Sequence, residues 1–242
     1  MTTNQRSTDA SATPTEARIR SPQRKQRLAW VALIGVLLLG GYFRTLGLFS
    51  WDDPSYRLHP DERFMTDVAS LGRMPASLGQ YFDSSLNTLN PRNNGKDFYV
   101  YGLFPQTLTR LAAVMLTPNS RLPEMVPQDR SDNAYMISNP ELSIPKLLPL
   151  QALLNPTGLN LTEYGEIHKV GRAWSALFDI VSLLLVFLIG RRLYGRRVGL
   201  LAALLLAAAV LPIQLAHFFT VDSITACFTL LTVYWADGNR CL

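Results

Sequence analysis

Cysteine is almost absent from this sequence, which contains only Cys227 and Cys241 among its 242 residues. Two cysteines cannot build a framework of several disulfides. The sequence also has no G-x-x-x-x-G-K-[ST] phosphate-binding loop and no H-E-x-x-H motif, which argues against an NTP-driven pump and a zinc protease. Strand and helix patterns do not alternate along the chain, so a soluble enzyme acting on nucleotide sugars is also disfavoured.

Charged side chains are missing from long stretches of the chain. Residues 28–43 contain none, residues 173–190 contain only Asp179, and residues 198–219 are apolar except for two polar side chains. Each stretch approaches or reaches the roughly 20 residues that cross a bilayer as a helix. The sequence therefore predicts an all-α integral membrane protein with a multi-span helical bundle.

Basic residues exceed acidic ones, 23 against 18, and they gather at the ends of the apolar stretches. This placement is typical of topology signals and does not indicate a nucleic-acid partner. Residues 1–27 are rich in Ser, Thr, Arg and Pro without apolar periodicity, so we expect a disordered basic tail in the cytoplasm. Residues 28–50 follow as a retained transmembrane helix, because no small-residue cleavage site follows the apolar stretch.

Residues 51–169 are predicted to form one large loop on the outer side. Within this loop, residues 98–117 are long enough to span, but Pro105 breaks the stretch and Arg110 interrupts it. If this segment crossed, the basic residues 191–197 would lie outside, against the charge rule. We therefore expect a helix lying on the outer leaflet, with Arg110 on its polar face. The apolar stripe of that helix would consist of Leu108, Leu111, Ala112 and Met115.

Transmembrane helices two to four are predicted within residues 170–236, followed by a tail at 237–242. Residues 119–156 hold many prolines and polar residues and should be irregular. The fourth helix is short, so we expect an incomplete bundle with further membrane helices or subunits as partners. The predicted location is the plasma membrane, as a multi-pass protein with a cytoplasmic N-terminus.

The sequence RLHPDERF, residues 57–64, follows the first apolar stretch and carries two adjacent acids. Pro60 suits the first position of a helix, since its missing N–H would have no partner there. Asp61 and Glu62 would then lie in the first turn of a helix that ends before Gly72.

Several stretches of the chain together resemble one enzyme family. They are HPDERF after the first span, YGLFPQTL in the loop, and GRAWSALFDIVSLLLVFLIGRRLYGRRVGLLAALLLAAA with FFTVDS towards the end. These stretches are similar to the N-terminal part of the GT-C membrane glycosyltransferases. The likeness is closest to the protein O-mannosyltransferase-like branch (glycosyltransferase family 39), which includes the lipid A aminoarabinose transferases. It covers roughly residues 28–236.

The resemblance implies an enzyme that takes a sugar from a polyprenyl or dolichyl phosphate and transfers it, on the non-cytoplasmic side, to a protein, lipid or glycan. Its partners would be this lipid-linked donor, membrane lipids and an unidentified acceptor. An acid in the first external loop is important in such enzymes and maps to Asp61, beside Glu62. Asp222 matches an aspartate near the cavity of relatives. Tyr101 stands where the aminoarabinose transferases carry Glu-Lys-Pro, and both residues are candidates for substrate binding.

Asp61 could be the base that takes the proton of the acceptor, if partial burial raises the pKa of its carboxyl group. The alternative is that it only favours the helix dipole. Successive helical residues point about 100° apart, so Glu62 cannot face the same atom and would hold a partner or a cation. His59 could join Asp61 in binding a divalent cation. No second histidine stands at ligand spacing, so a surface or hydrogen-bonding histidine is favoured, and the cofactor stays unassigned.

Arg172 could clamp a lipid-linked phosphate through its planar fork, or it could extend to the lipid headgroups. Arg44 has the same two interpretations, with headgroup contact favoured. Asp222 could orient the acceptor or cap a helix that begins at Ser223. Asp179 lies inside a span, where a charge is costly, so it should be neutral or paired with a basic residue of a missing helix.

Two other classes of function are compatible with the sequence. The chain could be a catalytically incomplete membrane subunit or a truncated product. It could also be a transporter that uses Asp179 near the middle of the bilayer.

Overall fold

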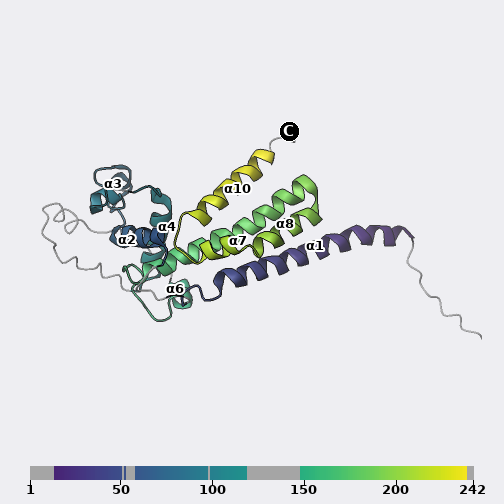
Figure 1. The fold of residues 1–242 in the computed structure, drawn as a ribbon, viewed down its shortest axis with the longest axis horizontal. Helices are drawn as coiled ribbons and strands as arrows, with labels where there is room; N and C mark the ends of the chain where they lie inside the picture. Colours follow the sequence, from purple (N-terminus) through teal and green to yellow (C-terminus); the bar gives the residue numbers. More distant parts are fainter. Residues whose placement is uncertain (1–13, 51, 53–57, 98, 119–147, 239–242) are drawn as a thin grey trace, which may run out of the picture.

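The computed structural model describes residues 14–50, 52, 58–97, 99–118 and 148–238, with only the backbone of residues 14–26. Within these ranges all regular structure is helical (Figure 1). The elements are α1 (Pro14–Thr45), α2 (Pro60–Leu71), α3 (Leu78–Phe82), the 3₁₀ helix η1 (Pro91–Asn94), α4 (Leu103–Leu116), α6 (Leu148–Leu154), α7 (Ile167–Tyr194), α8 (Arg196–Ala207), α9 (Val210–Ala216) and α10 (Asp222–Gly238). The predicted all-α membrane class is confirmed.

Helix α1 begins at Pro14, well before the first apolar stretch. The prediction of a disordered tail is therefore wrong for residues 14–27, while residues 1–13 lie outside the described residues. Most of residues 14–27 are Arg, Gln, Ala, Glu or Lys, which are good helix formers.

Two segments are long and apolar enough to cross a membrane, Arg27–Thr45 of α1 and Ile167–Tyr194 of α7. The predicted third span is divided into α8 and α9, which meet at a bend of 60°. Pro212 accounts for this bend, because in a continuous helix its ring would clash with the carbonyl group of Ala208. Helix α10 packs against α7 and has 17 residues.

Helices α7 and α8 form a tight pair joined at Gly195. This glycine has a φ of +91°, a conformation that favours glycine. Further along, a Cβ on Gly199 would stand only 2.6 Å from the carbonyl oxygen of Phe187, so the two backbones touch there. The pair packs against α1 through a core of Leu33, Phe187 and Ala203.

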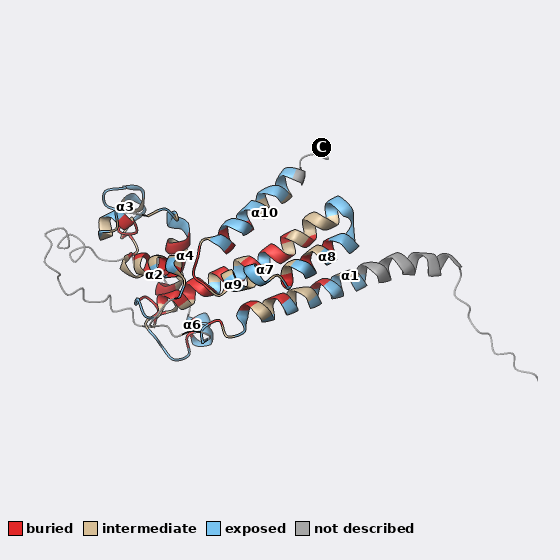
Figure 2. Cartoon of the chain, viewed as in Figure 1, coloured by how far each residue is buried: buried red, intermediate tan, exposed pale blue. Residues whose placement is uncertain are grey.

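Helices α2 and α4 pack against α7, α6 packs against α4, and α3 lies beyond α2 and α4 at the edge of this end (Figure 1). Buried residues concentrate at this end of the bundle (Figure 2). Met65, Ala113, Ile167 and Phe219 belong to its apolar core. Phe219 lies so close to α7 that a Cβ on Gly171 would meet its ring at 2.1 Å. The segment predicted as an external loop is thus packed onto the end of the spans.

Helix α4 confirms a helix within residues 98–117, but Arg110 does not lie on an exposed face. Its side chain is 1% exposed, and Nη1 donates to the carbonyl oxygens of Ser70 at 3.3 Å and Thr162 at 3.0 Å. These carbonyl groups replace water as acceptors, so the predicted exposure of Arg110 is wrong. The predicted apolar stripe is half-buried.

The stretch predicted to be irregular, residues 119–156, is described only in its last part. Residues 119–147 lie outside the described residues. Leu148–Leu154 forms α6, so the prediction is wrong for this short segment. Leucine is a good helix former and dominates it, which offsets the effect of its single proline near the start.

Arg44 of α1 and Asp179 of α7 form a buried ion pair. Arg44 also donates to the carbonyl oxygens of Leu206 at 3.2 Å and Ala207 at 3.1 Å, in the last turn of α8. Carbonyl groups at a helix end lack their usual amide partners, and the bend after α8 creates such an end here. The predicted headgroup contact of Arg44 is therefore wrong, and the partner of Asp179 lies on α1 rather than on a missing helix.

Replacing Gly199 with alanine should lower the melting temperature of the purified protein in detergent, because the new methyl group clashes with the α7 backbone. A clash of this kind costs about 1–3 kcal/mol. Gly35→Ala is the matched control, since a Cβ at that position meets no atom within 4 Å. An unchanged melting temperature for Gly199→Ala would contradict the close pairing of α7 and α8.

Candidate active site

The predicted start of a helix at Pro60 is confirmed by α2, Pro60–Leu71. His59 is the N-cap residue, and its Nδ1 accepts the amide N–H of Asp61 at 3.2 Å. The two acids of the first turn have different surroundings. Asp61 is half-buried, whereas Glu62 is fully buried. They therefore cannot perform the same task.

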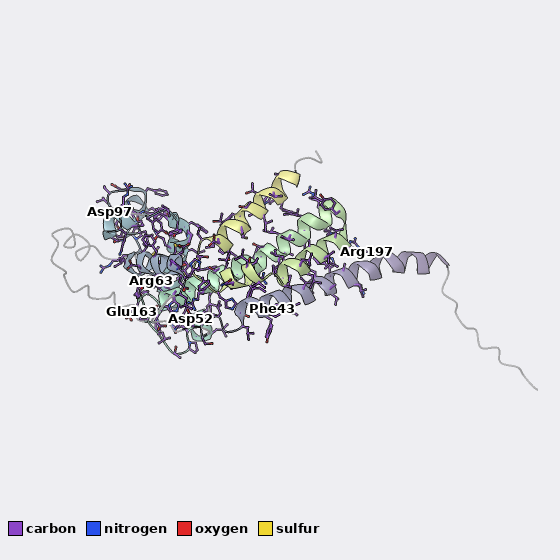
Figure 3. All side chains as sticks on the ribbon, in the orientation of Figure 1. Phe43, Asp52, Arg63, Asp97, Glu163 and Arg197 are labelled. Atoms are coloured by element: carbon purple, nitrogen blue, oxygen red, sulfur yellow. The ribbon has the colours of Figure 1, made fainter. Side chains whose placement is uncertain are left out.

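Glu62 points into the protein and meets Arg172 of α7. Nε of Arg172 donates to Oε1 of Glu62 at 2.6 Å, and Nη2 donates to Oε2 at 2.7 Å. Nη1 and Nη2 also donate to the two carboxylate oxygens of Asp52, each at 2.8 Å. Asp52 lies where the helices around α2 meet the spans (Figure 3). One guanidinium group thus connects the segment after α1 to α2 and α7.

Two backbone groups complete this cluster. Nη1 of Arg172 reaches the carbonyl oxygen of Leu48 at 3.4 Å. The amide N–H of Phe219 donates to Oε1 of Glu62 at 3.0 Å. The cluster therefore also holds the segment that leads into α10.

All five N–H groups of Arg172 are directed at acceptors of the protein. Phosphate binding and headgroup contact both need a free side of the guanidinium group, and none is left. The hydrogen bonds from Arg172 hold the pKa of the Asp52 carboxyl below its usual value. Sequence reasoning missed Asp52, although its position just after the first span was a usable signal.

Asp61 faces the segment that leads into α4. The hydroxyl group of Tyr101 donates to Oδ1 of Asp61 at 2.8 Å. The ring of Phe64 lies against those of Tyr99 and Tyr101, with centroids 5.9 Å apart in both cases. The pKa of the Tyr101 phenol is raised, mainly by its hydrogen bond to Asp61 and next by burial. The fold thus brings Asp61 and Tyr101 together, while Asp222 is the first residue of α10.

A pocket of about 450 Å³ lies beside Tyr101, between the start of α4 and helix α10. We call it the α10 pocket. Most of its lining is apolar, and Phe104 meets Phe228 edge to face at 5.6 Å. Its apolar lining includes Leu103, Phe104, Val221, Ile224 and Phe228. The pocket therefore has mostly apolar walls, and one end is formed by the phenol that is hydrogen-bonded to Asp61.

His59 serves as a helix cap in this structure. Its Nδ1 accepts the Asp61 amide N–H, and its ring packs on Phe218 with centroids 4.8 Å apart. Among the residues that the structure describes, no three of His, Cys, Asp and Glu lie close enough together to hold a metal ion. What His59 does here is fix the first turn of α2, and with it the position of Asp61.

Part of this chain is similar to a known protein family. Residues 153–236 match the family model of the dolichyl-phosphate-mannose-protein mannosyltransferases. The match runs from the end of α6 through α7, α8 and α9 into α10, and the resemblance predicted from the sequence is confirmed there. The family consists of membrane glycosyltransferases that use a dolichyl-phosphate mannose donor. No curated protein and no solved structure matches the chain.

Arg172→Met should lower the melting temperature in detergent at neutral pH, because it leaves Asp52 and Glu62 buried without their counter-charge. Breaking a buried pair in this way costs about 3–5 kcal/mol. Arg197→Met is the control, since Arg197 is exposed at the other end of the bundle (Figure 3).

The difference between wild type and Arg172→Met should narrow as the pH falls below about 4. The lowered pKa of Asp52 means that its ion pair stabilises the fold fully above the ordinary value of 3.8 and is lost as the pH falls through the folded-state pKa. Melting temperatures between pH 7 and pH 3 test this. A constant difference over that range would contradict the assigned charge state of the cluster.

Proposed function

We propose that this chain is a membrane glycosyltransferase, or the N-terminal part of one. It takes a sugar from a polyprenyl or dolichyl phosphate and transfers it to a hydroxyl group of a protein, lipid or glycan. The observation that carries the proposal is the position of Asp61. Its carboxylate accepts a hydrogen bond from Tyr101, which lines the α10 pocket. Part of that pocket is formed by the segment that matches the mannosyltransferase family.

The α10 pocket suits the isoprenoid chain of the donor. Ligand pockets are mostly apolar, with a few polar groups that fix orientation. Here Leu103, Ile224 and Phe228 provide apolar walls, and Tyr101 provides a polar end. Helix α10 forms one wall and carries exposed apolar side chains, so a lipid tail could reach the pocket from the bilayer.

Asp61 is the proposed general base. It removes the proton of the acceptor hydroxyl group as that oxygen attacks the anomeric carbon of the sugar. The bond from this carbon to the phosphate oxygen breaks, and the phosphate leaves with the electron pair. Tyr101 orients the carboxylate through its hydrogen bond. Glu62 and Arg172 are positioning residues, because they hold α2 and α7 together and do not face the pocket.

We further propose that residues 58–118 and 148–166 face the non-cytoplasmic side. The basic residues around Gly195 support this orientation by the positive-inside rule. A transporter that uses Asp179 gains no support, since this acid is paired with Arg44. A subunit without catalytic activity would show no sugar transfer in the assay described below.

Single-cysteine labelling tests the orientation, after replacement of the two native cysteines. Ser84→Cys should react with a membrane-impermeant maleimide added to intact cells, because Ser84 is exposed on the proposed outer region. Tyr194→Cys, also at an exposed position, should react only after permeabilisation. The reverse pattern would overturn the orientation and the proposed access to the donor.

Asp61→Asn should reduce sugar transfer from dolichyl-phosphate mannose by about 10² to 10⁴, the usual contribution of a general base. The assay follows labelled mannose transferred by reconstituted protein to a mixed membrane extract that supplies the acceptors. Asp67→Asn is the matched control on the same helix, because Asp67 pairs with Lys96 at 2.5 Å and lies outside the site. Equal activity of wild type and Asp61→Asn would remove the assigned base.

A further inference from the structure

A second pocket, of about 500 Å³, lies against the same segment that borders the α10 pocket. The two pockets share Gly102 and Leu103, and α3 and η1 contribute to the second one. We call it the α3 pocket. Gly102 has a φ of +74°, and a Cβ there would project into open space. Tyr101, which precedes this shared segment, lines the α10 pocket and donates a hydrogen bond to Asp61.

Aromatic rings shape the α3 pocket. Tyr81 and Phe82 stand next to each other with centroids 5.1 Å apart, and Tyr99 contributes a third ring. The hydroxyl group of Tyr99 is held by the carbonyl oxygen of Gly102 at 2.8 Å. Phe82 is 78% exposed, so its ring is accessible to a ligand. The pocket thus presents flat apolar faces to the solvent.

The α3 pocket also carries a positive charge. Arg92 lines it and is exposed, and its guanidinium group makes no hydrogen bond or ion pair with any described residue. Among the described residues that line the pocket there is no Asp or Glu. A ligand of this pocket therefore meets one cation that no acid of the lining neutralises.

We propose that the α3 pocket binds the acceptor, and that the acceptor is an anionic saccharide. The C–H groups of a sugar ring are polarised by neighbouring oxygens and pack well on the electron-rich faces of aromatic rings. The fork of Arg92 matches a carboxylate or phosphate with two parallel hydrogen bonds. This inference rests on the proposed function, because it places the acceptor on the other side of Gly102 and Leu103 from the donor, near the Tyr101 that holds Asp61.

Binding tests the inference independently of catalysis. Isothermal titration calorimetry on the full chain in detergent uses three probes: a disaccharide that contains glucuronic acid, its neutral glucose counterpart, and a peptide rich in serine and threonine. The acidic disaccharide should bind, and the neutral one should bind about fivefold more weakly, as expected for one exposed ion pair. The peptide should not compete.

Two variants with matched controls locate the binding. Phe82→Ala should weaken binding of the acidic disaccharide about tenfold through loss of the stacking ring. Leu78→Ala is its control, since Leu78 is 77% exposed on the same helix and does not line the pocket. Arg92→Gln should weaken binding about fivefold, and Arg197→Gln, at the far end of the bundle, should leave it unchanged.

Saccharide binding and sugar transfer are measured separately, so the acceptor pocket and the proposed enzyme activity are tested independently. Asp61→Asn should bind the disaccharide like wild type while losing sugar transfer. Absence of saccharide binding to wild type overturns the inference, even if mannose transfer is observed. Peptide binding that depends on Phe82 and Arg92 also overturns it, since the acceptor would then be a polypeptide. Saccharide binding that is insensitive to both variants overturns the assigned pocket.

Discussion

The arrangement of the helices around α2 depends on one buried arginine. Arg172 lies between the carboxylates of Asp52 and Glu62, with every hydrogen-bond donor of its side chain engaged. Taking such charges out of water costs several kcal/mol each, and only complete pairing offsets that cost. Because the partners come from different segments, no segment can move alone without leaving a buried charge unpaired. The cluster therefore fixes how the helices around α2 sit on the membrane bundle.

Under the proposed function, this cluster also places the base. Asp61 adjoins Glu62 in the chain, so the anchored acid on one side and the His59 cap on the other determine where the Asp61 carboxylate points. The ring of Phe64, on the same helix as Asp61, packs against Tyr99 and Tyr101. These contacts fix α2 relative to the segment between the two pockets. Catalysis depends on holding reacting groups within fractions of an ångström, which a rigidly packed support provides.

Sequence reasoning succeeded where a residue's role depends on its neighbours in the chain. Apolar length predicted the membrane class, and Pro60 with Gly72 predicted α2. It failed for charged side chains whose partners lie 110 or 135 positions away, as for Arg172 with Glu62 and Arg44 with Asp179. An isolated arginine near a span end has several equally sound interpretations, and only the packing of distant segments chooses between them. The bend at Pro212, in contrast, follows from a local rule that could have been applied.

The ion pair between α1 and α7 has a consequence for how the chain enters the bilayer. The ribosome makes Arg44 135 residues before Asp179, and an arginine without a partner is costly inside hydrocarbon. Until α7 and α8 have been inserted, Arg44 is best accommodated at the water boundary. Helix α1 therefore reaches its final depth only after α7 and α8, which supply the partners of Arg44, have been inserted.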